Sequence, residues 1–295
     1  MSVEQDLKSH LILEGALNGE LEFLDEGLHG LVLEEYGIFP GCIALSEYII
    51  KKTREAMRHK PSLKTVFFNF KNSPFLSTAE IRITDKYDAA YSSAKTVFKE
   101  GKLYPAIFLI SAEELYEDRA VDLIAHELTH AYQDWCRMKK GLSNSWRKDI
   151  ADGNYKNDEI GKSKIGTLLY LLNLFEEDAY MAQIATSLKR RKQYFGSVRE
   201  MMDYLKTLIP YKNYLKLFKY VEEYKTIDDK ETQEEMLAKV SELSNFKFDN
   251  YNKFLKWLDR RCYRIKNRFE RYIPKILYQN MISKNKPRGI LNTEI

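Results

Sequence analysis

The stretch "VDLIAHELTHAYQDW", Val121 to Trp135, decides how this sequence is interpreted. Its apolar residues recur at spacings of three and four, through Val121, Ile124, Leu128 and Trp135. This period predicts an amphipathic helix with one apolar face, which packs against the rest of the fold. The polar face of the same helix carries two of the chain's five histidines.

His126 and His130 lie one helical turn apart, so their imidazoles can converge on a single ion, as tetrahedral zinc (Zn²⁺) requires. Glu127 directly follows the first histidine. From there its carboxylate can reach a water held by the ion, take its proton and pass it to a leaving amine. The alternative interpretation is an ordinary helix with two partly exposed histidines and no metal. The helical setting after a predicted strand favours the metal site.

Short runs of β-branched and aromatic residues, separated by turn signals, follow Pro61 and predict three or four strands. The runs are "KTVFFNF" (64–70), "TAEIRIT" (78–84), "AYSSAKTVF" (90–98) and "YPAIFLIS" (104–111). Helices are predicted before them, over 11–31 and about 43–58, with a break at "GIFPG" (37–41), and after them from Ala112 onward. The polar segment 139–164 is predicted to be a long loop.

This order of helices, strands and many helices predicts an α+β fold, in which a small, mostly antiparallel sheet packs on the histidine helix. A large helical part follows. The basic run "LKRRK" (188–192) is the predicted boundary between residues 1–187 and a helical subdomain over 188–295. A hydrophobic content of 44% is ample for packed cores, and three widely separated cysteines exclude a disulfide framework. With neither a signal peptide nor a membrane span in the sequence, we expect a soluble, cytoplasmic protein.

The motif "HELTH" after the strand "YPAIFLIS" resembles the active-site helix of the zincin metallopeptidases, over about residues 64–186. Zincins differ in their third zinc ligand. The metzincin pattern has glycine and histidine where this chain has Gln133 and Cys136, and the aspzincin pattern needs aspartate in the Cys136 position. The gluzincin pattern takes a glutamate from a separate helix downstream, and the resemblance is to this type.

Residues 168–185, "LLYLLNLFEEDAYMAQIA", match the gluzincin requirement, because they are predicted to be helical and carry acids in an apolar stretch. A carboxylate buried among apolar residues is costly unless it is paired or binds a metal. Glu176 is the predicted third ligand, since Ala179 one turn later leaves room for the histidine helix; Glu177 is the alternative. A solvated edge of the helix would also explain these acids. Asp178 is a candidate hydrogen-bond partner for a ligand histidine.

The oxyanion donor stays open at this stage, because Tyr170, Tyr180, any other tyrosine or His59 fits the family's use of Tyr or His. The resemblance also implies that a peptide substrate adds to the sheet edge at 90–98.

Basic and aromatic residues alternate in the C-terminal half, a pattern that can bind nucleic acid. A regular stripe of apolar residues favours a core helix instead: Leu255, Leu258, Cys262, Ile265, Phe269 and Tyr272. The sequence thus predicts a zinc peptidase, with endopeptidase action and a peptide or protein substrate. The alternative is a non-catalytic binding or structural protein on the same scaffold, which contacts nucleic acid through its basic helices.

Overall fold

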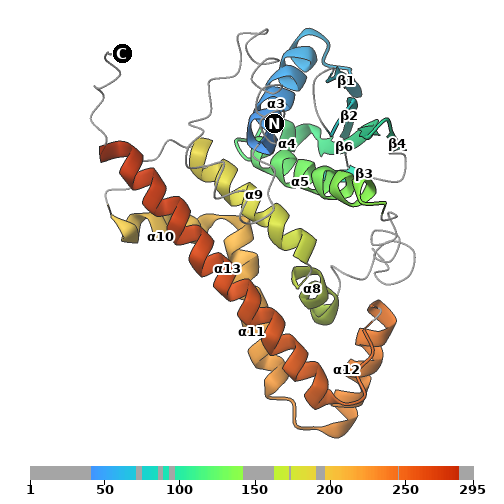
Figure 1. Cartoon of the computed structure of the whole chain (residues 1–295), viewed down its shortest axis with the longest axis vertical. Helices are drawn as coiled ribbons and strands as arrows, with labels where there is room; N and C mark the ends of the chain where they lie inside the picture. Colours follow the sequence, from blue (N-terminus) through green and yellow to red (C-terminus); the bar gives the residue numbers. More distant parts are fainter. Residues whose placement is uncertain are drawn as a thin grey trace.

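The computed structural model describes residues 41–70, 75–85, 89–92, 97–141, 163–172, 174–190, 197–244 and 246–285. The predicted helix over 11–31, the break before Gly41 and most of the loop predicted over 139–164 lie outside the described residues. The described chain is a mixed α/β structure with a small sheet and mostly helical content (Figure 1).

Four of the described strands form one sheet in the order β1-β2-β6-β3, where the strands are β1 (Thr65–Asn69), β2 (Thr78–Thr84), β3 (Ala89–Ser92) and β6 (Ala106–Ser111). The β1–β2 and β3–β6 pairs are antiparallel, whereas β2 and β6 run parallel, with Ile81 opposite Phe108. The prediction of a small, mostly antiparallel sheet is confirmed.

The predicted strand over 90–98 is wrong as a single element, because its two ends belong to different sheets. Its first residues lie in β3, and its last begin a hairpin of β4 (Val97–Lys99) and β5 (Lys102–Tyr104). Glu100 and Gly101 both have positive φ, as a two-residue type I′ turn requires. The indole of Trp135 donates a 2.8 Å hydrogen bond to the Gly101 carbonyl, which ties this turn to the histidine helix.

The first helices of the described chain pack with the sheet around one core. These helices are α3 (Gly41–His59), α4 (Ala112–Tyr116) and α5 (Ala120–Lys139). The predicted helix over about 43–58 is confirmed by α3. Helix α5 packs on α3 and on strands β3, β5 and β6. Its apolar stripe faces this core as predicted, with Ile124 and Leu128 fully buried and Val121 and Trp135 nearly so.

The remaining described helices build a second core below the sheet in Figure 1. They are α8 (Lys164–Leu171), α9 (Leu174–Arg190), α10 (Val198–Thr207), α11 (Ile209–Lys225), α12 (Lys230–Leu243) and α13 (Tyr251–Asn285). On α13, Leu258, Cys262, Ile265 and Phe269 are buried and Leu255 is partly buried, which confirms the predicted stripe at the positions whose side chains are described.

Residues 168–185 form two helices rather than one, because α8 ends at Leu171 and α9 begins at Leu174. Leu172 therefore does not share a helix with Glu176. Helix α9 connects the two cores: it packs against α5, and Met181 and Ile184 lie in the second core. The division of the chain at 187/188 stays a prediction.

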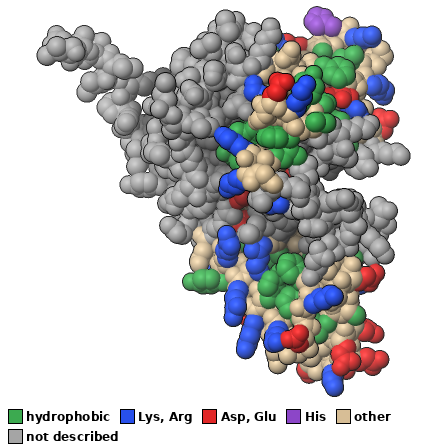
Figure 2. Space-filling model, turned by 45° about the vertical axis from the view of Figure 1, so that its right-hand side comes forward, with side chains coloured by type: hydrophobic (Ala, Val, Ile, Leu, Met, Phe, Trp, Pro, Cys, Tyr) green, Lys and Arg blue, Asp and Glu red, His purple; other side chains and the backbone are tan. Residues whose placement is uncertain are grey.

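Lys and Arg side chains gather along the lower, helical part of the face drawn in Figure 2, with acidic side chains at its lower right. Within the described ranges, no helix has the length and hydropathy needed to cross a membrane.

The packing of the second core predicts that substitutions at two positions on α13 lower the free energy of unfolding by very different amounts. Leu258→Ala removes a fully buried side chain, so we expect the free energy of unfolding to fall by about 2–5 kcal/mol. Tyr263→Ala, at a side chain that is 68% exposed on the same helix, should change it by less than about 0.5 kcal/mol. Urea denaturation followed by circular dichroism measures both values, and equal small losses would contradict this packing.

Candidate metal centre

Helix α5 brings the two histidines of the "HELTH" motif together in the interior. The helix begins at Ala120, directly after Arg119, whose guanidinium pairs with the buried Glu114 carboxylate. His126 and His130 are 7% and 5% exposed, and their Nε2 atoms lie 3.2 Å apart. Their rings meet edge to face, with 4.9 Å between centroids. The motif therefore places two imidazole nitrogens at one point, as the spacing predicts.

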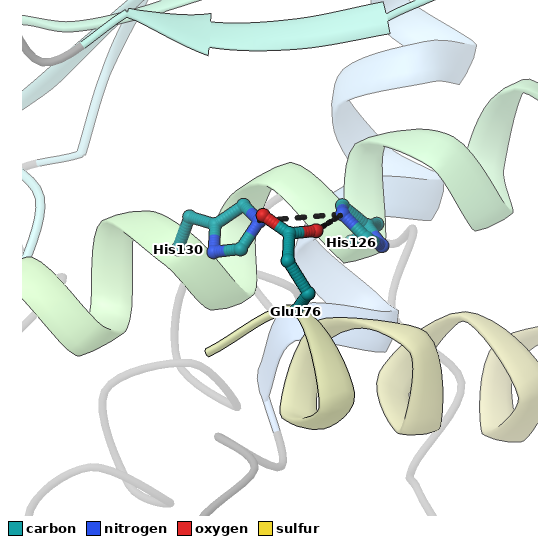
Figure 3. A group of neighbouring side chains, drawn as sticks. All are labelled: His126, His130 and Glu176. Atoms are coloured by element: carbon teal, nitrogen blue, oxygen red, sulfur yellow. Dashed lines mark hydrogen bonds and ion pairs between the residues drawn. The ribbon is translucent and has the colours of Figure 1, made fainter. Parts of the chain in front are cut away.

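Glu176, in the first turn of α9, points across to the two imidazoles on α5 (Figure 3). Its Oε2 lies 3.3 Å from Nε2 of His126, and its Oε1 lies 3.4 Å from Nε2 of His130. Among the described residues, these three side chains are the group of His, Cys, Asp and Glu that can hold a metal ion. Glu177 is buried but lies outside this group, and so does the half-buried Cys136.

The spacing of the three side chains suits a small divalent cation. Nitrogen and oxygen ligands at about 2.0–2.2 Å from a tetrahedral ion lie about 3.3–3.6 Å from one another. The two imidazole nitrogens, 3.2 Å apart, are close to this value, and they lie 3.3 and 3.4 Å from different oxygens of the Glu176 carboxylate. Two imidazole nitrogens and one carboxylate oxygen would hold such an ion, and a tetrahedral ion would then keep one position for water or substrate. One ligand atom from each of the three residues lies within 4.8 Å of the others, so this group can hold a metal ion.

The charge state of Glu176 also suits metal binding. Burial alone would raise the pKa of this carboxyl group, but attraction to His130 and hydrogen bonds with both imidazoles outweigh it and hold the pKa well below its ordinary value. Glu176 is therefore ionised at neutral pH, which is the form that binds a cation. The hydroxyl of Tyr170 donates a 2.6 Å hydrogen bond to Oε2 of Glu176 and fixes the carboxylate further.

A side-chain amide orients His130. Its Nδ1 lies 2.9 Å from Oε1 of Gln133, which can only accept, so Nδ1 donates its proton there and Nε2 is the ring nitrogen that faces Glu176. The Nε2 group of Gln133 donates in turn to Oδ2 of Asp178 at 3.3 Å. Asp178 is thus linked to His130 through Gln133. The sequence signal for Gln133 was its i+3 spacing from His130, which places both on one face of α5.

His126 differs from His130 in its second nitrogen, since its Nδ1 is buried with no hydrogen-bond partner among the described residues. Its ring instead packs against Tyr180 of α9, with 4.9 Å between ring centroids. The hydroxyl oxygen of Tyr180 accepts a 3.2 Å hydrogen bond from Nδ2 of Asn213 on α11. His126 is therefore held by packing, whereas His130 is held by a hydrogen bond.

Among the described residues, the tyrosine candidates Tyr170 and Tyr180 lie at the site. Burial, followed by the charges of Glu176 and Glu127, raises the pKa of Tyr180 to about 12. Burial and the same Glu176 carboxylate raise the pKa of Tyr170 well above its ordinary value. Both phenols therefore keep their protons at neutral pH and can act as donors. His59 lies at the exposed last residue of α3, outside the group.

Removing the amide at position 133 tests its role as the partner of His130. We expect Gln133→Leu to weaken metal binding by roughly 10–100-fold, because the imidazole loses the acceptor that fixes its tautomer. Competition with a chromophoric chelator measures the affinity. Lys139→Ala, at an exposed position on the same helix, is the matched control and should bind as the wild type does. An unchanged affinity in Gln133→Leu would show that Gln133 does not orient the ligand.

Comparisons with known proteins leave this site to be judged on its own geometry. No protein-family model, no curated protein and no solved structure matches the chain. The geometry by itself shows that the two buried histidines and the partly buried Glu176 form a group that can hold a metal ion.

Proposed function

We propose that this protein is a zinc-dependent peptidase of gluzincin type. The observation that carries the proposal is the meeting of His126 and His130 with the remote carboxylate of Glu176 at separations of 3.2–3.4 Å. Two imidazole nitrogens and one carboxylate oxygen with an open fourth position are a donor set typical of catalytic zinc. The resemblance of "HELTH" to the zincin active-site helix supports the same assignment.

Zinc in such a site polarises a carbonyl group and lowers the pKa of a coordinated water to about 7. The chain's own contribution to proton transfer is Glu127, which is half-buried and directly follows His126 on α5. Its carboxylate takes the proton of the attacking water and delivers it to the leaving amine. The rigid packing of α5 on the sheet keeps this base in place beside the ligands.

Tyr180 is the proposed donor to the oxyanion that develops on the scissile carbonyl. Tyr170 is committed to Glu176 by its 2.6 Å hydrogen bond. The Tyr180 hydroxyl accepts from Asn213 and is hydrogen-bonded with Tyr170, and its raised pKa keeps its proton in place at neutral pH, so the phenol is a neutral donor beside the ligands. A donor aimed at developing negative charge in a buried site is worth far more than in water.

A peptide substrate would bind along the edge of the sheet. Strand β3 is an edge strand in the described four-stranded sheet, and α5 packs against it. An extended peptide can add to such an edge through main-chain hydrogen bonds. This placement would bring a scissile bond near the histidine helix, which is the arrangement that the zincin resemblance implies.

Metal analysis together with peptide hydrolysis tests the assignment. We expect purified wild-type protein to contain one zinc ion per chain and to cleave a mixed peptide library. His126→Ala should lose the metal. Glu127→Gln should keep it while hydrolysis falls by about 10²–10⁴-fold, because only the base is removed. Wild-type protein without stoichiometric zinc, or a fully active Glu127→Gln, would refute the proposal.

The role of Tyr180 has a separate kinetic signature. Tyr180→Phe should lower kcat by about 10²–10³-fold with little change in KM or zinc content, because the donor acts mainly in the transition state. Tyr263→Phe, at an exposed tyrosine on α13, is the matched control and should be unaffected. If kcat is unchanged in Tyr180→Phe, the oxyanion donor is another group.

A non-catalytic protein on the same scaffold is the second candidate, and the exposed basic residues of α13 favour it. Lys256, Arg260 and Arg264 are exposed on this helix, where they can contact phosphates. Zinc binding without peptide hydrolysis, together with DNA or RNA binding that weakens steeply with salt, would support this candidate over the peptidase.

A further inference from the structure

The break between α8 and α9 allows a contact at the metal centre that a continuous helix would forbid. Residues six apart on one α-helix differ in direction by about 240°, so their side chains point to different sides. Tyr170 and Glu176 are six residues apart, yet the tyrosine hydroxyl lies 2.6 Å from the carboxylate. The contact exists because α8 ends at Leu171 and α9 starts anew at Leu174.

Arg261, from the last long helix, stabilises this break. Its Nη2 donates a hydrogen bond to the main-chain carbonyl of Leu172, the residue that caps the C-terminal end of α8. The final carbonyls of a helix have no donor within the helix, and a cation at that end is favoured by the helix dipole. The Leu172 side chain is itself buried in the second core. Arg261 therefore supplies a donor to a carbonyl at the point at which α8 stops.

Helix α11, which also belongs to the helical C-terminal part, contacts the metal centre through Tyr180. Asn213 of α11 donates to the hydroxyl of Tyr180, whose ring packs on His126. Helix α11 thus contacts Tyr180, which packs on the ligand His126, and α13 contacts the Leu172 carbonyl at the break that precedes Glu176. The helical C-terminal part participates in building the metal centre, although all three ligands lie on α5 and α9.

We propose that Arg261 is a positioning residue of the metal centre, which sets the α8–α9 break and so holds Tyr170 against Glu176. This inference rests on the proposed metal site and adds a residue far from the zincin-like motif. When a hydrogen-bond partner of a metal ligand is lost, affinity typically falls 10–100-fold. Arg261 acts one step further away, so the loss should lie near the lower end of that range.

Zinc affinity of the full-length protein, measured by chelator competition, tests the inference. We expect Arg261→Ala to bind zinc roughly 10-fold more weakly than the wild type. Arg260→Ala changes the adjacent, exposed arginine and should leave the affinity unchanged. The visible absorption spectrum of the cobalt-loaded protein should differ between Arg261→Ala and the wild type, since ligand geometry determines it. A purely structural role would lower thermal stability without changing the affinity or the spectrum.

A double-mutant cycle shows whether Arg261 acts through Tyr170. In a Tyr170→Phe background the contact is already absent, so Arg261→Ala should cost less than about twofold in zinc affinity. An equal loss in both backgrounds overturns the proposal, as does wild-type affinity in Arg261→Ala. Arg261→Lys keeps a cationic donor for the Leu172 carbonyl and should recover most of the affinity. If Arg261→Ala does not fold, Tyr170→Phe by itself carries the comparison, because it removes the contact through which Arg261 is proposed to act, and wild-type zinc affinity in Tyr170→Phe overturns the proposal.

The same measurements separate this inference from the proposed function. Wild-type protein that binds no zinc overturns both. Zinc binding without peptide hydrolysis removes the peptidase and leaves the role of Arg261 intact. If the wild type binds zinc and cleaves peptides while Arg261→Ala keeps the wild-type zinc affinity, only the role of Arg261 is refuted.

Discussion

The meeting of α5 and α9 is the contact on which this structure and its proposed chemistry depend. It places the largely buried Glu176 carboxylate, whose side chain is 13% exposed, against His126 and His130, and a carboxylate removed from water is costly unless it is paired. Without the two imidazoles this packing would be unfavourable, and without the packing the imidazoles would have no third partner. Ala179, one turn beyond Glu176, is fully buried.

Each of the two helices packs into a different hydrophobic core. The sheet core holds α5 through Ile124 and Leu128, and the helical core holds α9 through Met181 and Ile184. Polar contacts then adjust the ligands within the site: the Gln133 amide is shared by His130 and Asp178, and the Tyr170 hydroxyl reaches Glu176. A site on rigid, separately packed elements keeps its geometry before any ion arrives, which lowers the cost of binding.

Features that depend on residues close together in the sequence could be predicted, whereas features that depend on residues far apart in the sequence could not. Helical spacing places His126 and His130 together, and carboxylates in an apolar helix point to Glu176, because these are local patterns. The parallel pairing of β2 with β6 and the break after Leu171 were not predictable in this way. Both depend on partners distant in the chain, and the break is capped by a side chain 89 residues away. The positions of Tyr170 beside Glu176 and of Tyr180 beside His126 likewise depend on tertiary contacts.

The most direct measurement of the central claim is X-ray diffraction from zinc-loaded crystals, with data collected on both sides of the zinc absorption edge. We predict one strong anomalous peak that lies about 2.0–2.2 Å from Nε2 of His126, Nε2 of His130 and a carboxylate oxygen of Glu176. A peak held by other side chains, or none between α5 and α9, would contradict the metal centre and the peptidase derived from it.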